Sequence, residues 1–209
     1  MAANIKKTIY LIRHGETDFN KQGIIQGSGI NSHLNEHGRK QANMFYETYK
    51  SIAFDHVYTS ELIRTQQTVE AFTKNTPQTH LAELNEINWG IMEGVKQTPE
   101  MSKEYQKMVD NWSKGILEIA IENGETPLAM FNRQKVGLER IMQKTEEKYV
   151  LISMHGRAMR SFLCLLCQKP LSEMEKWGHS NVCLYILEFN GSHFDIILSN
   201  NTEHLNKFY

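Results

Sequence analysis

Two apolar segments of this 209-residue chain are each followed by the same dipeptide, His-Gly. Thr8–Arg13 precedes His14, and Tyr149–Met154 precedes His155. Continuous apolar runs with β-branched residues indicate strands buried on both faces, which usually run parallel in an α/β sheet. Ligands bind beyond the carboxyl ends of such strands, so we expect the two imidazole rings to point into one crevice.

The residues around the first histidine indicate a site for an oxyanion. Arg13 directly precedes His14, and an arginine beside a neutral imidazole favours phosphate above other anions. A neutral imidazole is also a competent nucleophile near pH 7. A bend at Gly15 would let both side chains converge, although successive strand residues point to opposite faces. A lone His-Gly is more typical of an ordinary strand-end turn, and the second His-Gly is what favours a site.

Strands alternate with helical segments along the chain, which predicts one α/β domain over residues 1–209. We expect a three-layer α/β/α fold with a mostly parallel sheet, helices on both faces and a helical insertion, Val95–Asn123, over the active site. The expected strands are Thr8–Arg13, His56–Thr59, Thr79–Leu84, Tyr149–Met154 and a hairpin of Asn181–Phe189 and His193–Ser199 that turns at Asn190-Gly191. The expected helices are Glu36–Ile52 with Asn35 as its cap, Glu61–Lys74 with Ser60 as its cap, Thr126–Glu147 and Gly156–Cys167. In the third helix, Phe131, Leu138 and Met142 are expected to face inward, with Lys135 interrupting the stripe.

Charge and composition exclude several classes of protein. The chain has 23 Lys and Arg against 24 Asp and Glu, whereas a nucleic-acid binder would show a basic excess. No apolar stretch approaches the length of a membrane span, and Met1–Lys7 lacks the apolar region of a signal peptide. Three cysteines do not make a disulfide framework in a chain of this length. We therefore expect a cytoplasmic protein that binds neither nucleic acid nor membrane.

The segment Leu11–Asn20 resembles the signature of the histidine phosphatase superfamily, also called the phosphoglycerate mutase-like superfamily. Further segments resemble that family in the family's own order, although Asn35 stands where threonine is more usual. They are Gln26-Gly27, Leu34–Ala42, Tyr58–Thr68 with Arg64, Leu84–Gly94 with Glu86, and Ser153–Gly156. One Arg-His-Gly would be weak evidence, but ordered matches over most of the chain are specific.

This resemblance implies a set of roles for the matching residues. His14 would attack phosphorus and become a phosphohistidine, while Arg13, Arg64 and His155 would hold the phosphoryl oxygens. Glu86 would protonate the leaving oxygen and then take a proton from the hydrolytic water. The substrate-binding residues implied are Asn20, Gln26, Gly27, Gly156 and Thr17. The resemblance implies no metal ion and no cofactor.

Among the family's activities, the sequence favours a phosphatase. The chain is short for a cofactor-dependent phosphoglycerate mutase, and Trp89–Gly94 resembles the phosphatase branch more than its mutase counterpart. We expect a metal-independent phosphomonoesterase of the histidine acid phosphatase type that acts on a small phosphorylated metabolite. The alternatives are mutase-type phosphoryl transfer and a non-catalytic module that binds a phosphorylated ligand. A homodimer is an expectation from the family alone.

Several residues allow a second interpretation. Glu93 is a rival to Glu86 as the acid. Arg157, where many relatives carry a small residue, could bind a second anionic group of the substrate, but a surface salt bridge is favoured. His33 and His37 match an inverted zincin pattern, which requires both on one helix; with Asn35 as the helix cap, His33 falls outside. Cys164 and Cys167 have redox spacing within an apolar helix, where buried cysteines usually act as small hydrophobes.

Overall fold

The computed structural model describes residues 6–206. In this part of the chain, six strands form one mixed sheet in the order β3-β2-β4-β1-β5-β6. β1 to β4 run parallel to one another. β5 runs antiparallel to β1, and β6 runs antiparallel to β5. The strands are β1 (Thr8–Arg13), β2 (His56–Thr59), β3 (Gln78–His80), β4 (Tyr149–Met154), β5 (Leu184–Phe189) and β6 (Phe194–Asn201).

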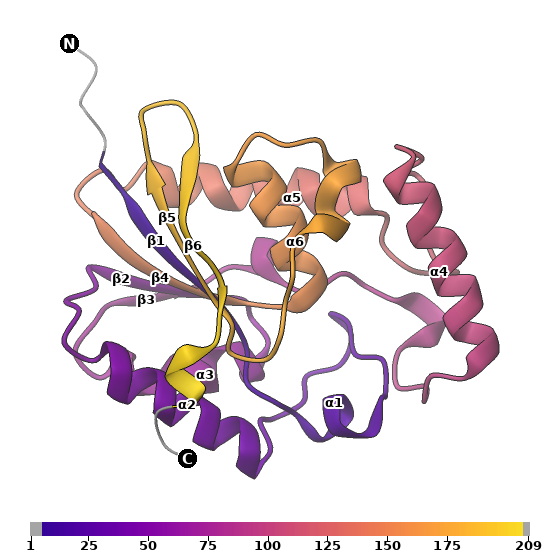
Figure 1. The fold of residues 1–209 in the computed structure, drawn as a ribbon, viewed down its shortest axis with the longest axis horizontal. Coiled ribbons are helices and arrows are strands. Elements are labelled where there is room, and N and C mark those ends of the chain that lie inside the picture. The colour runs from indigo at the N-terminus through magenta and orange to yellow at the C-terminus, as the bar shows by residue number, and fades with distance from the viewer. Residues whose placement is uncertain (1–5, 207–209) are drawn as a thin grey trace.

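Helices cover both faces of this sheet (Figure 1). They are α1 (Asp18–Gln22), α2 (Glu36–Tyr49), α3 (Ile63–Thr73), α4 (Pro99–Ser113), α5 (Pro127–Met142) and α6 (Gly156–Leu166), with the short turns η1 (Ala82–Leu84), η2 (Gly90–Met92), η3 (Leu171–Lys176) and η4 (Glu203–Leu205). Side chains of β1 alternate between two cores: Leu11 packs with the core of α5 and α6, and Ile12 with the core of α2 and α3. The three-layer α/β/α fold is confirmed.

The buried parallel strands β1, β2 and β4 have the predicted bounds, because each is a short apolar run with clear ends. β3 is shorter than predicted, since the chain turns into η1 after His80. α2 begins as predicted, with Asn35 Oδ1 accepting a hydrogen bond from the Gly38 amide at 2.8 Å. It ends at Tyr49 rather than Ile52.

The start of α3 was predicted wrongly. The helix begins at Ile63 instead of Glu61, and Leu62 is its N-terminal cap. Ser60 Oγ accepts from the Leu62 amide at 3.1 Å, so the serine orders the turn that leads into the helix. Its hydroxyl has a second partner in the active site, described below.

The inward face of α5 is broader than predicted. Phe131, Leu138 and Met142 pack against the core as half-buried side chains, and the fully buried residues beside them include Met130, Gln134, Gly137 and Ile141. Gln134 is satisfied in the core because its amide donates to the Ala158 carbonyl and accepts from Ser161, both on α6. Because a glutamine and a glycine lie on the core side, the spacing of apolar residues alone does not define the buried face of this helix. The helix ends at Met142, whereas the prediction extended it to Glu147.

The last two corrections concern the insertion and the hairpin. Of Val95–Asn123, only α4 forms a long helix, and its Trp112 is fully buried in the core. The hairpin closes through a longer loop than Asn190-Gly191, with the Asn190 amide donating to the His193 carbonyl at 3.0 Å.

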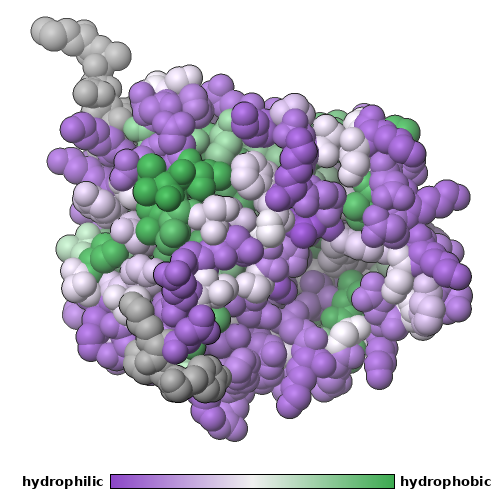
Figure 2. Space-filling view, in the orientation of Figure 1, coloured by the Kyte–Doolittle hydropathy of each residue, from purple (hydrophilic) through white to green (hydrophobic). Residues whose placement is uncertain are grey.

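The visible surface is mostly hydrophilic (Figure 2). No helix within residues 6–206 combines the length and apolar character needed to cross a membrane. The prediction that Met1–Lys7 is not a signal peptide falls largely on residues 1–5, outside the described part.

Candidate active site

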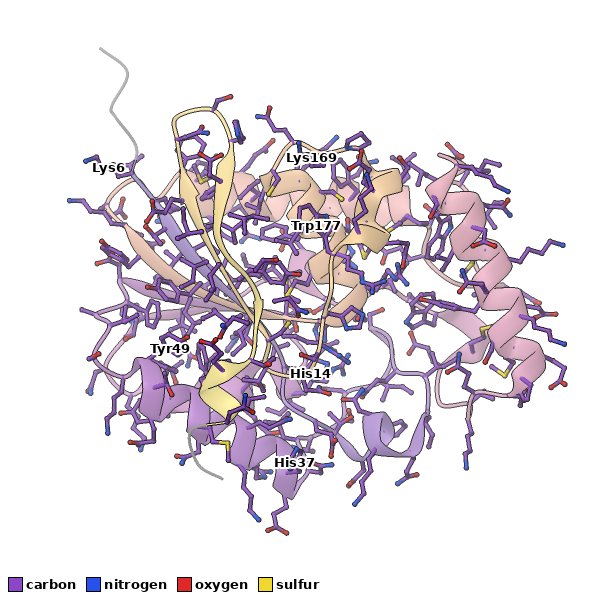
Figure 3. The ribbon with its side chains drawn as sticks, viewed as in Figure 1. Lys6, His14, His37, Tyr49, Lys169 and Trp177 are labelled. Atoms are coloured by element: carbon purple, nitrogen blue, oxygen red, sulfur yellow. The ribbon has the colours of Figure 1, made fainter. Side chains whose placement is uncertain are left out.

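The two His-Gly motifs meet because β1 and β4 are neighbouring parallel strands. Arg13 pairs with Met154 in the register, so the next residues, His14 and His155, leave the sheet at the same level. Their ring centroids lie 5.1 Å apart, and both side chains are buried. Figure 3 shows His14 at the carboxyl end of β1, near the centre of the molecule. The expectation that the two imidazole rings come together at the carboxyl ends of the two strands is confirmed.

His14 keeps one ring nitrogen unprotonated. Its Nδ1 lies 2.7 Å from the Gly15 carbonyl oxygen, and a carbonyl only accepts, so Nδ1 carries the ring proton and Nε2 keeps its lone pair. Burial, helped by the positive charges of Arg64 and Arg13, holds the pKa of His14 well below its usual value. Nε2 is therefore free to act as a nucleophile at neutral pH.

Arg64 ties three parts of the site together from the first turn of α3. Its Nε donates to His155 Nδ1 at 3.1 Å, Nη1 donates to the Ile30 carbonyl at 2.6 Å, and Nη2 donates to the Gly27 carbonyl at 3.1 Å. Burial lowers the pKa of Arg64 to about 10, so the group remains cationic at neutral pH. The two carbonyls anchor the loop that follows β1 against the second histidine.

Arg13 has a donor that no group in the described part of the chain accepts. Its Nη1 donates to Nδ1 of His179 at 3.1 Å, but its Nε is buried without a hydrogen-bond partner within residues 6–206. An unpaired buried donor on a charged group costs about 1–3 kcal/mol or more. The chemistry of this donor fits an anionic oxygen next to His14.

The tautomer of His155 is fixed through Ser60. His155 Nδ1 accepts from Arg64, so Nε2 carries the proton and donates to Ser60 Oγ at 2.8 Å. Ser60 Oγ also accepts from the Leu62 amide and lies 2.9 Å from Thr65 Oγ1, to which its own proton is directed. Burial and the nearby arginines hold the pKa of His155 well below its usual value.

Glu86 is buried and caps α6. Its Oε1 accepts from the amides of Ile87 and Ala158 at 2.9 and 2.8 Å, and its Oε2 accepts from the amide of Arg157 at 3.0 Å. The helix that begins after His155 thus orients this carboxylate, leaving Oε2 the less occupied oxygen. The rival Glu93 accepts from the Trp89 amide at 3.0 Å instead.

The loop after β1 is held by its own side chains. Thr17 Oγ1 accepts from Gln26 Nε2 at 2.7 Å and donates to Asn20 Oδ1 at 3.1 Å, while Gln26 Oε1 accepts from Ser32 at 2.6 Å. Asn20 Oδ1 is used in these contacts, so its Nδ2 donors are the atoms that could bind a ligand. A Cβ at Gly27 would lie 2.4 Å from the backbone carbonyl oxygen of Ile87, which explains the glycine there.

Arg157 was predicted to form a salt bridge at the surface. The salt bridge is present, but the predicted exposure of Arg157 was wrong. Arg157 does pair with Glu175, but it is buried. Its guanidinium hydrogen-bonds the Tyr105 hydroxyl and lies 5.4 Å from the Trp112 ring centroid, both on α4. The insertion therefore covers the start of α6, and sequence alone could not place its aromatic rings there.

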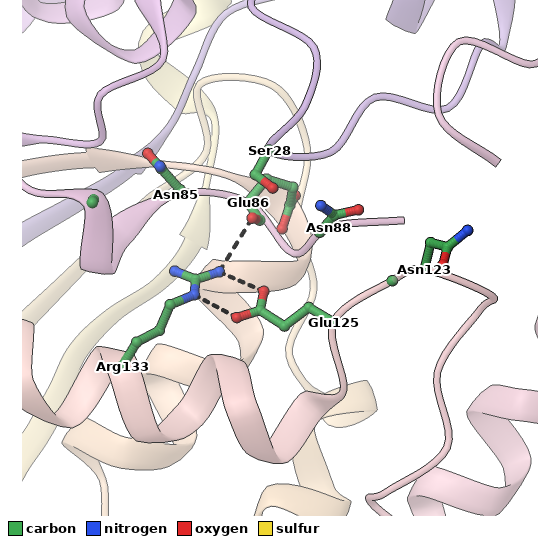
Figure 4. Close-up of a pocket in the computed structure, with 9 residues that line it drawn as sticks. Ser28, Asn85, Glu86, Asn88, Asn123, Glu125 and Arg133 are labelled. Atoms are coloured by element: carbon green, nitrogen blue, oxygen red, sulfur yellow. Dashed lines mark hydrogen bonds and ion pairs between the residues drawn. The ribbon is translucent and has the colours of Figure 1, made fainter. Parts of the chain in front are cut away.

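A pocket of about 370 Å³ adjoins the site at Glu86 (Figure 4). Its lining includes Ser28, Asn85, Asn88 and Asn123, and Arg133, which forms a bidentate ion pair with Glu125. Arg133 also donates to the Glu86 carbonyl at 3.1 Å, which fixes the backbone of the acid. Most of the residues that line the pocket have polar side chains, and its one arginine is already paired.

Two other patterns have a structural explanation. Asn35 caps α2 and leaves His33 outside the helix that carries His37, as predicted; no three His, Cys, Asp or Glu side chains gather as a metal-binding group within 6–206. Cys164 is buried, Cys167 is half-buried, and burial raises the pKa of the Cys164 thiol to about 11.

Three residues that contact the site were not predicted to do so. His179 holds Arg13, Ser60 holds His155, and Asn181 Nδ2 donates to the His14 carbonyl at 2.9 Å. Ser60 lies in a segment that resembles the family, so its place at the end of β2 was a usable signal. His179 and Asn181 lie in an irregular segment whose approach to β1 depends on the complete sheet.

The family model of the histidine phosphatase superfamily (branch 1) matches residues 9–202, and the chain belongs to this superfamily. Phosphoserine phosphatase 1 of Hydrogenobacter thermophilus is 27% identical over 96% of this chain and 95% of its own. The probable phosphoglycerate mutase GpmB of Yersinia pestis is 29% identical over 88% of this chain and 86% of its own. The structure of the alpha-ribazole phosphatase from Shigella flexneri aligns with a TM-score of 0.81 at 24% identity, covering 93% of this chain and 96% of its own.

Acid is expected to destabilise the protein through its site histidines. Burial lowers the pKa of His14, His155 and His179, so the folded state keeps these rings neutral while the unfolded chain protonates them near their ordinary value of 6.5. Their stabilising contribution is therefore complete above that value and is lost as the pH falls, by up to about 1.4 kcal/mol per pH unit for each ring. Urea unfolding between about pH 7 and pH 5 measures this slope. A free energy of unfolding that stays constant or rises on acidification would contradict it.

Proposed function

We propose that this protein is a metal-independent phosphomonoesterase that hydrolyses a small phosphate ester through a phosphohistidine at His14. The observations that carry the proposal are the lone pair on Nε2 of His14 and the Nε–H of the preceding residue, Arg13, which is buried without a hydrogen-bond partner in the described part of the chain. A nucleophile next to anion-binding donors is what phosphoryl transfer requires. The phosphatases among its relatives support the same class of reaction.

In the first step, His14 Nε2 attacks phosphorus while the bond to the leaving oxygen breaks. Arg13 and Arg64 hold the phosphoryl oxygens, where two guanidinium groups stabilise the developing charge. Glu86 gives its proton to the leaving oxygen, and an alcohol departs. His14 then carries the phosphoryl group on Nε2, and Nδ1 keeps its proton on the Gly15 carbonyl.

In the second step, water attacks the phosphohistidine. The Glu86 carboxylate accepts the proton from this water, the P–N bond breaks, and the electron pair returns to Nε2. Inorganic phosphate leaves, and both His14 and Glu86 regain their starting protonation states. Transfer to a second substrate oxygen in place of water would make the same site a mutase, an activity for which GpmB is named.

The test is turnover of a panel of phosphate esters in the presence of EDTA, with inorganic phosphate and rearranged ester both measured. The panel contains p-nitrophenyl phosphate, phosphoserine, 3-phosphoglycerate and sugar phosphates. We expect release of phosphate that EDTA does not reduce. Isomerisation of 3-phosphoglycerate that exceeds its hydrolysis would favour the mutase, and phosphate binding without any turnover would favour a binding module.

Replacement of Glu86 by Gln is expected to slow the enzyme according to the leaving group. An alkyl phosphate needs a proton on its departing oxygen, so its kcat is expected to fall by roughly 10²–10⁴-fold, whereas p-nitrophenyl phosphate loses much less. Steady-state rates on both substrates measure the difference. The matched control is Glu93→Gln, since Glu93 lies in the same loop. If the control shows the dependence on leaving group and Glu86→Gln does not, Glu93 is the acid.

A further inference from the structure

A third histidine lies against the phosphate-binding arginine. His179 follows η3 in an irregular segment, and its Nδ1 lies 3.1 Å from Arg13 Nη1, across 166 positions of sequence. A guanidinium has donors and no acceptor, so Nδ1 of His179 accepts and its Nε2 carries the ring proton. The hydrogen bond fixes one edge of the Arg13 guanidinium.

The backbone beside His155 leaves room for this ring. A Cβ at position 156 would lie 3.1 Å from Cε1 and 3.3 Å from Nδ1 of His179, and 3.4 Å from Arg13 Nε. Contacts this short are tighter than ordinary packing, so a side chain at Gly156 would press on both partners of the hydrogen bond. The glycine of the second His-Gly motif therefore accommodates the pair formed by His179 and Arg13.

The surroundings of His179 keep its ring neutral. Burial lowers the pKa of His179 to about 3, and the positive charges of Arg13, Arg160 and Arg157 act in the same direction. Glu175 pairs with Arg157 and Arg160. The group that accepts the hydrogen bond from Arg13 is therefore an uncharged imidazole ring at neutral pH.

A neutral acceptor is suited to an arginine that must bind an anion. A carboxylate at this place would orient the guanidinium equally well, but its charge would cancel that of Arg13 and oppose a phosphoryl group. We propose that His179 is a positioning residue that holds Arg13 Nη1 and so directs the remaining donors of Arg13 at the phosphoryl oxygens without reducing its charge. This inference rests on the proposed function, because it takes a phosphoryl group as the ligand of Arg13.

Three substitutions separate orientation from charge. His179→Leu removes the acceptor, His179→Asn keeps a neutral acceptor at the branch that corresponds to Nδ1, and His179→Asp adds a charged one. Each is compared with the wild type for the Kd of inorganic phosphate by calorimetry, for kcat and KM on p-nitrophenyl phosphate, and for Tm.

We expect His179→Leu to raise the Kd of phosphate and the KM by about tenfold or more, since it removes a hydrogen bond to a charged group, which is stronger than one between neutral groups. His179→Asn is expected to restore both to within about threefold of the wild type, which a merely structural role would not predict. His179→Asp is expected to bind phosphate more weakly than His179→Asn at a similar Tm.

Two results would overturn the inference. A wild-type Kd and KM in His179→Leu would remove the role of His179 while leaving the phosphatase intact. Equal losses in the Asn and Leu variants, with equal Tm, would show that the acceptor is not what matters. A wild type that binds no inorganic phosphate would overturn both the inference and the proposed function.

Discussion

Replacement of His14 by Asn is expected to abolish turnover while the protein stays folded. Asparagine can still donate to the Gly15 carbonyl, as Nδ1 of His14 does at 2.7 Å, but it offers no lone pair to phosphorus. Removing a covalent nucleophile costs on the order of 10⁴–10⁶-fold in kcat. Rates on p-nitrophenyl phosphate in EDTA measure this loss, and the Kd of inorganic phosphate is expected to stay within about tenfold of the wild type, because the arginines remain.

The matched control is His37→Asn, since His37 is exposed on α2. We expect that variant to keep wild-type kinetics. A His14→Asn enzyme that retains even about one hundredth of wild-type kcat would contradict nucleophilic catalysis by this residue, given the size of the expected loss.

Replacement of Arg64 by Lys is expected to give the second largest loss. Lysine keeps the charge but cannot reach His155, Gly27 and Ile30 together, as the three nitrogens of Arg64 do. We expect kcat/KM to fall by roughly 10²–10³-fold, the effect of removing a donor that stabilises transition-state charge. The Tm is expected to fall too, since the buried Gly27 carbonyl and the half-buried Ile30 carbonyl lose their donors.

The control for this substitution is Arg39→Lys, because Arg39 is exposed on α2. It tests whether an arginine-to-lysine change harms the protein by itself. If Arg64→Lys retained the kcat/KM of the wild type, the phosphoryl group would be held without this guanidinium.

The site could be predicted as far as its residues lie on regular elements. His14 and His155 follow apolar strands, and neighbouring parallel strands end at one edge of the sheet. Arg64 and Glu86 were assigned by resemblance to a family. In the fold, Arg64 contacts His155, and Glu86 accepts from the amides of Arg157 and Ala158, which follow the second His-Gly.

What could not be predicted depends on packing between distant segments. His179 reaches Arg13 only when η3 has packed against α6 and β5 has paired with β1, and no periodic pattern marks its segment. Arg157 was expected at the surface, but α4 covers it with Tyr105 and Trp112. The core stripe of α5 contains Gln134, which a hydrophobic pattern excludes although its partners on α6 satisfy it.

The most direct test of the account is to trap the phosphoenzyme. The enzyme is mixed with p-nitrophenyl phosphate in EDTA and quenched in alkali within the first turnover, because phosphohistidine survives alkali and is lost in acid. Peptide mass spectrometry then locates the phosphoryl group. The account predicts a phosphoryl group on the peptide that contains His14, present during turnover and gone once substrate is exhausted. Turnover with His14 unmodified at every time point, or a phosphoryl group on another residue, would contradict it.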